Sequence, residues 1–175
     1  KIREVWPSSI LDVGVGYGRW GVLCREFLDV CRGDYDKNDW KTRIDGIEIF
    51  QNYLRPYHDY FYDRIIVGDA HAVLKKMNRT YDLIILGDVL EHFEKTKAIE
   101  FLNLCLNKSN YVMLNIPIGS GWEQGPQHGN AHEAHLSTWH LKELQSFPHK
   151  HFKVFFDEAG HSFASFLMVG KGVRR

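Results

Sequence analysis

The stretch "ILDVGVGYGRWG", residues 10–21, joins an apolar run to a turn that contains four glycines. The apolar run holds one charged residue, Asp12. Glycine has no Cβ, so its backbone tolerates positive φ angles and its N–H groups can approach a ligand closely. An apolar strand followed by a glycine turn that opens a helix predicts the first strand and helix of a parallel α/β sheet.

The rest of the chain repeats this alternation of short apolar runs and segments of helical period. Runs that are apolar throughout are typical of strands covered on both faces of a sheet. The last two strands are joined by the short connection "EAGHS", residues 158–162, which predicts an antiparallel pair. The expected strands are 9–15, 44–49, 64–67, 81–86, 110–116, 152–157 and 163–170, and the expected helices are 18–30, 52–62, 70–77, 91–106 and 137–147.

These elements predict one α/β domain over residues 1–175, with a doubly wound, Rossmann-like, mostly parallel seven-stranded sheet and a C-terminal antiparallel strand pair. Segment 31–43, "CRGDYDKNDWKTR", is polar and is interpreted as an insertion between the first helix and the second strand. Segment 118–136 is rich in glycine and histidine and follows the fifth strand, where we expect it to line a site at the carboxyl end of the sheet.

Composition argues against several classes of function. The chain has 22 basic and 22 acidic residues and no long block of Lys and Arg, which disfavours nucleic-acid binding, whose affinity depends on basic residues. No apolar run approaches the roughly 20 residues needed to cross a bilayer. Cys24, Cys31 and Cys105 show no C-x-x-C spacing, which favours reduced thiols in a cytoplasmic protein. Because residue 1 is Lys, we expect further residues to precede it.

The glycine turn allows two interpretations. Residues 16–21, "GYGRWG", match the dinucleotide pattern G-x-G-x-x-G, which would suit a nicotinamide-dependent oxidoreductase. In that pattern the first glycine comes directly off the strand, whereas here Gly14 already precedes it. The other interpretation is a strand, then Asp12, one residue, and G-x-G-x-G.

This second form resembles the first motif of the class I S-adenosylmethionine-dependent methyltransferases, hydrophobic-hydrophobic-D/E-x-G-x-G-x-G. The ligand of that family carries a sulfonium and an ammonium, so an acid beside the turn is favourable. The resemblance implies that Asp12 faces the amino-acid end of S-adenosylmethionine (SAM), with S-adenosylhomocysteine (SAH) as the product. The alternative is that Asp12 only caps the turn.

Acids also end the next three strands, and the resemblance gives each a role. Glu48 would accept both ribose hydroxyls, because a carboxylate has acceptor sites only. Asp69 would receive the adenine amino group while the N–H of Ala70 meets the ring, and Asp88 would lie beneath the methionine moiety. The residues that the resemblance places around the cofactor are Asp12, Gly14, Val15, Gly16, Tyr17, Gly18, Glu48, Ile49, Asp69, Ala70, Asp88 and Val89.

Segment 118–136, which we expect to form the acceptor side of the site, is rich in histidine. Orienting the two reactants contributes roughly 7–11 kcal/mol, against roughly 3–5 kcal/mol for a general base, so positioning matters more. Residues 127–139, "QHGNAHEAHLSTW", are similar to a loop in class I methyltransferases of glycan and cell-envelope biosynthesis. On that resemblance the favoured base or acceptor contact is His135, then His132, and His92 is a further candidate because it should project near the methyl donor.

Two alternatives for the histidine loop stay open beside the base. His128, His132, His135 and Glu133 could gather a metal, although the spacing is not H-E-x-x-H and we predict no metal. The same residues could instead be plain surface and helix-start positions.

The acceptor is predicted to be a small molecule or a saccharide, methylated on oxygen. Methylation of bases in DNA usually accompanies a [DNS]-P-P-[YFW] tetrad after the fourth strand, where this chain reads "GDVLEH", residues 87–92. We therefore expect no nucleic-acid partner. A domain that keeps the cofactor fold as a binding module without turnover is the non-enzymatic alternative.

Overall fold

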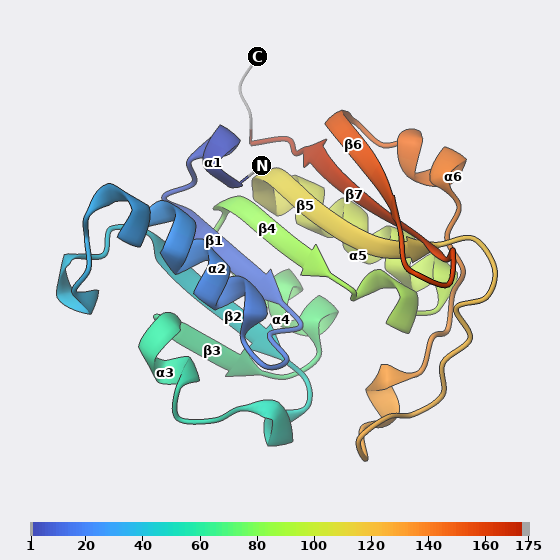
Figure 1. Ribbon diagram of the computed structural model, residues 1–175, viewed down its shortest axis with the longest axis horizontal. Coiled ribbons are helices and arrows are strands. Elements are labelled where there is room, and N and C mark those ends of the chain that lie inside the picture. The colour runs from blue at the N-terminus through green and yellow to red at the C-terminus, as the bar shows by residue number, and fades with distance from the viewer. Residues whose placement is uncertain (1, 173–175) are drawn as a thin grey trace. The chain divides into compact units, whose positions relative to one another are not determined.

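The computed structural model describes residues 2–172 and contains one seven-stranded sheet with the strand order β3-β2-β1-β4-β5-β7-β6 (Figure 1). Its mostly parallel strands and antiparallel C-terminal strands confirm the predicted fold class. The chain divides into two compact units, Lys1–Ile85 and Leu86–Arg175, and β4 (Tyr81–Gly87) crosses the boundary. Each unit is described by itself.

The first unit is built on three parallel strands. β1 (Ser9–Val13) pairs with β2 (Arg43–Glu48), and β2 pairs with β3 (Arg64–Val67). Helices α2 (Arg19–Leu28) and α4 (Ala70–Lys76) lie on opposite faces of these strands (Figure 1). This two-sided cover explains why the residues of β1 after Ser9 and of β2 after Arg43 are all buried rather than alternately buried and exposed.

The predicted helix 52–62 is wrong in its extent. The structure has a 3-10 turn at Gln51–Tyr53 and a short helix, α3 (His58–Phe61). Pro56 explains the break, because it lacks an N–H and disfavours helical geometry at the residue before it. A further short helix, α1 (Ile2–Val5), precedes β1.

The polar insertion 31–43 is held to the first unit by a buried aspartate. Asp29 Oδ1 accepts hydrogen bonds from the backbone N–H groups of Lys41 (3.0 Å) and Thr42 (3.1 Å). The guanidinium of Arg25 lies over the ring of Trp40, 4.5 Å from its centroid, and pairs with Asp29 at 3.0 Å. The insertion is therefore an ordered part of the unit, with 3-10 turns at Val30–Arg32 and Lys37–Asp39.

The second unit joins three antiparallel strands. β5 (Ser109–Ile118) pairs with β7 (Ser162–Val169), which pairs with β6 (His149–Phe156), so the predicted antiparallel pair is confirmed (Figure 1). Its helices are α5 (Lys95–Lys108) and α6 (Leu141–Gln145). Among residues 2–172, no helix has the length and apolar character needed to cross a membrane.

The second unit also corrects two helix starts. Helices from residues 91 and 137 were predicted, but α5 begins at Lys95 after a 3-10 turn at Leu90–His92, and α6 spans only Leu141–Gln145. The Glu91 carbonyl accepts the N–H groups of Leu136 (2.8 Å) and Ser137 (3.1 Å). These bonds from the loop after β5 take the place of the hydrogen bond that this carbonyl would accept in a helix.

Candidate functional site

The glycine turn after β1 adopts the backbone that only glycine takes easily. Gly14, Gly16 and Gly18 have φ angles of 72°, 53° and 83°. A Cβ placed on Gly16 would meet only the Gly14 carbonyl oxygen, at 3.9 Å. The missing side chain of Gly16 therefore leaves the backbone of the turn open at this residue.

Glu48, at the end of β2, anchors the turn. Its Oε2 accepts the N–H of Gly16 at 2.8 Å, and its Oε1 accepts the N–H of Phe50 at 2.7 Å. The side chain is 4% exposed. Each carboxylate oxygen has two lone pairs, so Glu48 retains acceptor sites that two further hydroxyls would need.

His58 braces the same turn from α3. Its Nε2 lies 3.1 Å from the Gly16 carbonyl oxygen, and since a carbonyl only accepts, Nε2 donates this bond. A Cβ on Gly18 would lie 3.2 Å from the His58 ring. His58 was not predicted as a site residue, because no motif marks which side chain of a short helix reaches a distant turn.

Asp12 is fully buried at the end of β1. Its Oδ2 accepts the Tyr62 hydroxyl at 2.5 Å, while its Oδ1 has no hydrogen-bond partner in the part of the chain that the structure describes. Burial raises the pKa of Asp12 to about 7; the Tyr62 bond lowers it and the charge of Glu48 raises it. The alternative that Asp12 only caps the turn is not what the structure shows, since its partner is Tyr62.

Tyr62 explains the fourth glycine of the opening stretch. Its hydroxyl accepts the N–H of Gly21 at 3.0 Å, and a Cβ on Gly21 would lie 2.5 Å from the Tyr62 ring. Gly21 therefore makes room for Tyr62, which in turn holds Asp12. Tyr62 is a second residue that sequence reasoning missed.

The other residues predicted around the cofactor have different surroundings. Asp69 is exposed and begins α4, where its Oδ1 accepts the Ala72 N–H at 2.7 Å. Tyr17 is 61% exposed within the turn. Asp88, in the second unit, has a φ of 58° and donates its N–H to the Asn115 carbonyl at 3.0 Å. The contacts of all the predicted residues with a cofactor, those of Asp12 and Glu48 included, stay predictions.

In the second unit, two of the three predicted histidines come together. The rings of His92 and His135 have centroids 4.9 Å apart. His92 Nδ1 lies 3.2 Å from the Ala134 carbonyl oxygen, and His135 Nδ1 lies 2.5 Å from that of Trp122. Burial lowers the pKa of His92.

Glu91 completes this group and was not predicted as a site residue. It is 2% exposed, and its Oε2 has no hydrogen-bond partner within residues 2–172. The pKa of Glu91 is raised to about 8, mainly by burial and also by the charges of Asp88 and Glu133, while a backbone hydrogen bond lowers it. The sequence signal was a carboxylate directly before His92 at a strand end.

His132 does not join the group. It is exposed on the 3-10 turn Ala131–Glu133, and its backbone N–H donates to Asn130 Oδ1 at 3.0 Å. The metal set considered from the sequence, His128, His132, His135 and Glu133, is therefore not what the structure gathers. Among the described residues the gathered set is Glu91, His92 and His135, whose ligand atoms lie within 4.8 Å of one another.

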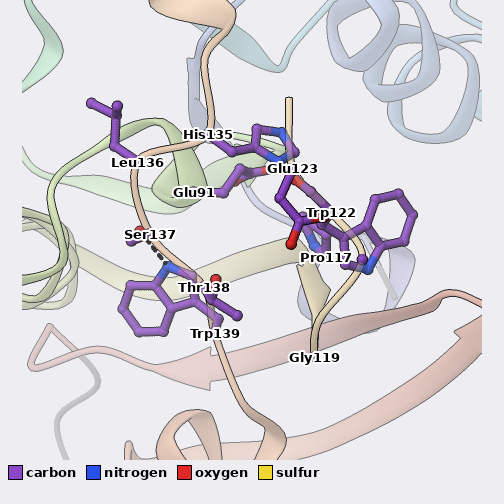
Figure 2. Close-up of a pocket in the computed structure, with 11 residues that line it drawn as sticks. Glu91, Pro117, Gly119, Trp122, Glu123, His135, Leu136, Ser137, Thr138 and Trp139 are labelled. Carbon is purple, nitrogen blue, oxygen red and sulfur yellow. Dashed lines mark hydrogen bonds between the residues drawn. The ribbon is translucent and has the colours of Figure 1, made fainter. Parts of the chain in front are cut away.

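A pocket of about 170 Å³ adjoins these side chains (Figure 2). Glu91 and His135 lie on its wall together with Trp122 and the buried Trp139, which donates its indole N–H to Ser137 Oγ at 3.1 Å. Typical ligand pockets hold roughly 300–1,000 Å³, so this one suits part of an acceptor rather than a large molecule.

A family model described as "Methyltransferase domain" matches residues 4–162. The chain belongs to this family. The assignment confirms the predicted enzyme class, a methyltransferase that uses SAM, and decides against the oxidoreductase interpretation of the glycine turn. No match was found among curated protein sequences.

Solved structures share the fold of this methyltransferase domain at low identity. A SAM-dependent methyltransferase from Archaeoglobus fulgidus is 16% identical over 91% of this chain and 85% of that chain, with a TM-score of 0.61. TehB from Haemophilus influenzae is 14% identical over 97% of this chain and 60% of its own, with a TM-score of 0.67. The N-terminal domain of EvdMO1, crystallised in the presence of SAH and D-fucose, is 13% identical over 97% of this chain and 80% of that chain, with a TM-score of 0.62.

Proposed function

We propose that this methyltransferase domain transfers the methyl group of SAM to a hydroxyl of a small-molecule or saccharide acceptor. The observation that carries the proposal is the buried Asp12 carboxylate, one oxygen of which lacks a partner among the described residues, next to an open glycine turn. An unpaired buried carboxylate is costly unless a cation or a donor joins it. The cationic amino-acid end of SAM fits this requirement.

The residues of the first unit would hold the cofactor in distinct ways. Asp12 would face its positive charge, and Glu48 would accept hydroxyls with the lone pairs that Gly16 and Phe50 leave available. The turn would contribute its backbone N–H groups. When bound, SAM supplies a methyl group made electrophilic by the cationic sulfur.

The second unit is proposed to act on the acceptor. The pocket beside His135 would take a hydroxyl-bearing part of it, and His135 or His92 would accept the hydroxyl proton. His132, on the exposed turn of the same loop, is proposed to contact the acceptor. The sugar present with EvdMO1 and the similarity of residues 127–139 to glycan-associated loops support a saccharide.

Calorimetry with SAH tests the cofactor site. Asp12→Asn and Glu48→Gln should each weaken SAH binding by more than about 1 kcal/mol, the scale of a lost charge-assisted contact. His135→Asn, in the other unit, should bind SAH as the wild type does. Unchanged affinity in both acid variants would refute the assignment.

Methyl transfer itself is tested with isotope-labelled SAM and fractionated pools of metabolites and glycans, followed by mass spectrometry. Label should appear on an acceptor oxygen with the wild type and fall sharply with His135→Asn. If SAH binds but no pool takes up label, the domain is a cofactor-binding module, and the proposed turnover is wrong.

A further inference from the structure

Three side chains of metal-ligand type converge in the second unit. Glu91 and His92 lie on the 3-10 turn Leu90–His92, and His135 lies in the loop after β5. One ligand atom from each lies within 4.8 Å of the others. The Glu91 carbonyl, bonded to Leu136 and Ser137, fastens the two segments together.

Both histidines are already oriented as metal ligands usually are. Each has its Nδ1 within hydrogen-bond distance of a backbone carbonyl, that of Ala134 for His92 and that of Trp122 for His135. A carbonyl oxygen only accepts, so each Nδ1 carries the hydrogen. The lone pair of each Nε2 is then available for a metal ion, which is the arrangement seen when an outer partner fixes a ligating imidazole.

Glu91 provides an independent observation. It is 2% exposed, yet its Oε2 has no hydrogen-bond partner among residues 2–172. A buried carboxylate oxygen without a hydrogen-bond donor is satisfied by a cation.

We propose that Glu91, His92 and His135 bind one divalent transition-metal ion. Two imidazole nitrogens and one carboxylate suit Zn²⁺, Mn²⁺, Fe²⁺ or Co²⁺ better than Mg²⁺ or Ca²⁺, which prefer oxygen ligands. Metal–ligand bonds of about 2.0–2.2 Å place neighbouring ligand atoms roughly 3–3.5 Å apart. Ligand atoms that lie within 4.8 Å of one another therefore close by at most about 1.3–1.8 Å on binding.

The ion would deepen the proposed function, on which this step rests. Three protein ligands leave coordination positions open, and Glu91 and His135 line the pocket proposed for the acceptor. A coordinated acceptor hydroxyl becomes more acidic and loses its proton to solvent, its oxygen forms a bond to the methyl carbon, and the methyl–sulfur bond breaks. His92 and His135 then hold the ion rather than accept the proton.

Metal binding is tested on the full chain after chelation and dialysis. Calorimetry with Mn²⁺ and absorption spectroscopy with Co²⁺ should show one ion per chain, with a Co²⁺ spectrum typical of nitrogen and oxygen ligands. His92→Asn and His135→Asn should each weaken binding at least tenfold. His132→Ala, which removes an exposed histidine of the same loop, should leave metal affinity unchanged.

Three results would overturn the metal proposal: absence of stoichiometric binding to the folded wild type, affinity unchanged in both His92→Asn and His135→Asn, or loss of binding in His132→Ala. Circular dichroism shows whether Glu91→Gln is folded. If it is not, the histidine variants alone decide the outcome. SAH calorimetry on the same samples separates the two proposals. Intact SAH binding without metal binding rejects the metal site alone, whereas metal binding without SAH binding rejects the proposed function alone.

Discussion

Tyr62 satisfies two buried groups of the first unit with one hydroxyl, which donates to Asp12 at 2.5 Å and accepts from the Gly21 N–H at 3.0 Å. Tyr62→Phe keeps the ring and leaves both groups without this partner. A buried polar group left unsatisfied costs about 1–3 kcal/mol, so the free energy of unfolding should fall by about 2–4 kcal/mol. Urea denaturation measures this change.

The matched control is Tyr57→Phe, on a neighbouring tyrosine that is 43% exposed and whose hydroxyl donates to the Tyr17 carbonyl at 3.3 Å. Solvent can replace that bond, so the control should stay within about 0.5 kcal/mol of the wild type. If the free energy of unfolding falls equally in the two variants, the buried hydrogen bonds of Tyr62 stabilise the protein no more than the exposed bond of Tyr57.

Asp12 gives the protein a defined dependence of stability on pH. Its pKa is about 7 in the folded chain against an ordinary 3.8, so between these values the folded state binds more protons than the unfolded state. The free energy of unfolding therefore falls as the pH rises from about 4 to 7 and levels off above pH 7. Asp12 accounts for at most about 4 kcal/mol of this fall.

Asp12→Asn carries no charge at any pH and should lack this component. The difference in stability between variant and wild type should shift in favour of the variant between pH 4 and pH 8, as measured by urea denaturation at several pH values. Glu91, whose pKa is also raised, is present in both proteins and cancels in the difference. A constant difference across this range would contradict the burial cost assigned to Asp12.

Individual residues differ in how far the sequence reveals them. Asp12 and Glu48 could be predicted because each is an acid at the end of an apolar strand, and parallel strands end at one edge of a sheet. His58 and Tyr62 could not be predicted, since His58 reaches the turn from α3 and Tyr62 reaches Asp12 from the residue after α3, and the position of α3 depends on the tertiary fold. Glu91 could not be predicted either, because its burial results from the tertiary fold and no sequence pattern indicates it.

Among the elements, strands were predicted better than helices for a physical reason. A strand covered on both faces is mostly apolar, as in β4, which the predicted strand 81–86 matches to within one residue. The predicted strand 64–67 agrees with the edge strand β3 to the residue. Helix ends depend on which groups take the terminal backbone hydrogen bonds. The start of α5 is displaced because Leu136 and Ser137 bind the Glu91 carbonyl, a contact that no local pattern indicates.

The glycine turn gives a prediction at the scale of an element. Gly18 and Gly33 both have positive φ angles, 83° and 96°, but a Cβ meets the His58 ring at 3.2 Å in the first and nothing within 4 Å in the second. Alanine at either position should cost roughly 1–2 kcal/mol of backbone strain. Only Gly18→Ala should also displace the turn and weaken SAH binding, at least tenfold by calorimetry.

Gly33→Ala is the control for strain without crowding and should bind SAH within twofold of the wild type. If both variants lose SAH affinity equally, backbone strain alone is sufficient to weaken binding. The close approach of Gly18 to His58 would then not be needed to shape the turn.

For the whole molecule, a bound cofactor should appear as added thermal stability. SAH at a hundred times its Kd raises the free energy of unfolding by about 2.7 kcal/mol. For a chain of 175 residues this corresponds to an increase in Tm of about 5–10 °C by calorimetry. Reduced nicotinamide cofactor at the same concentration should give no increase, and an increase with it alone would contradict the cofactor assignment.

Because the chain divides into two compact units, we expect SAH and Mn²⁺ to bind through separate sets of residues. Asp12 lies in the first unit, and His135 lies in the second. Asp12→Asn should therefore show a smaller increase in Tm with SAH than the wild type and the same increase with Mn²⁺, while His135→Asn should do the reverse. Scanning calorimetry of both variants, each with either ligand, measures the four combinations. A variant in which both increases shrink while its Tm without ligand stays near that of the wild type would contradict separate sites.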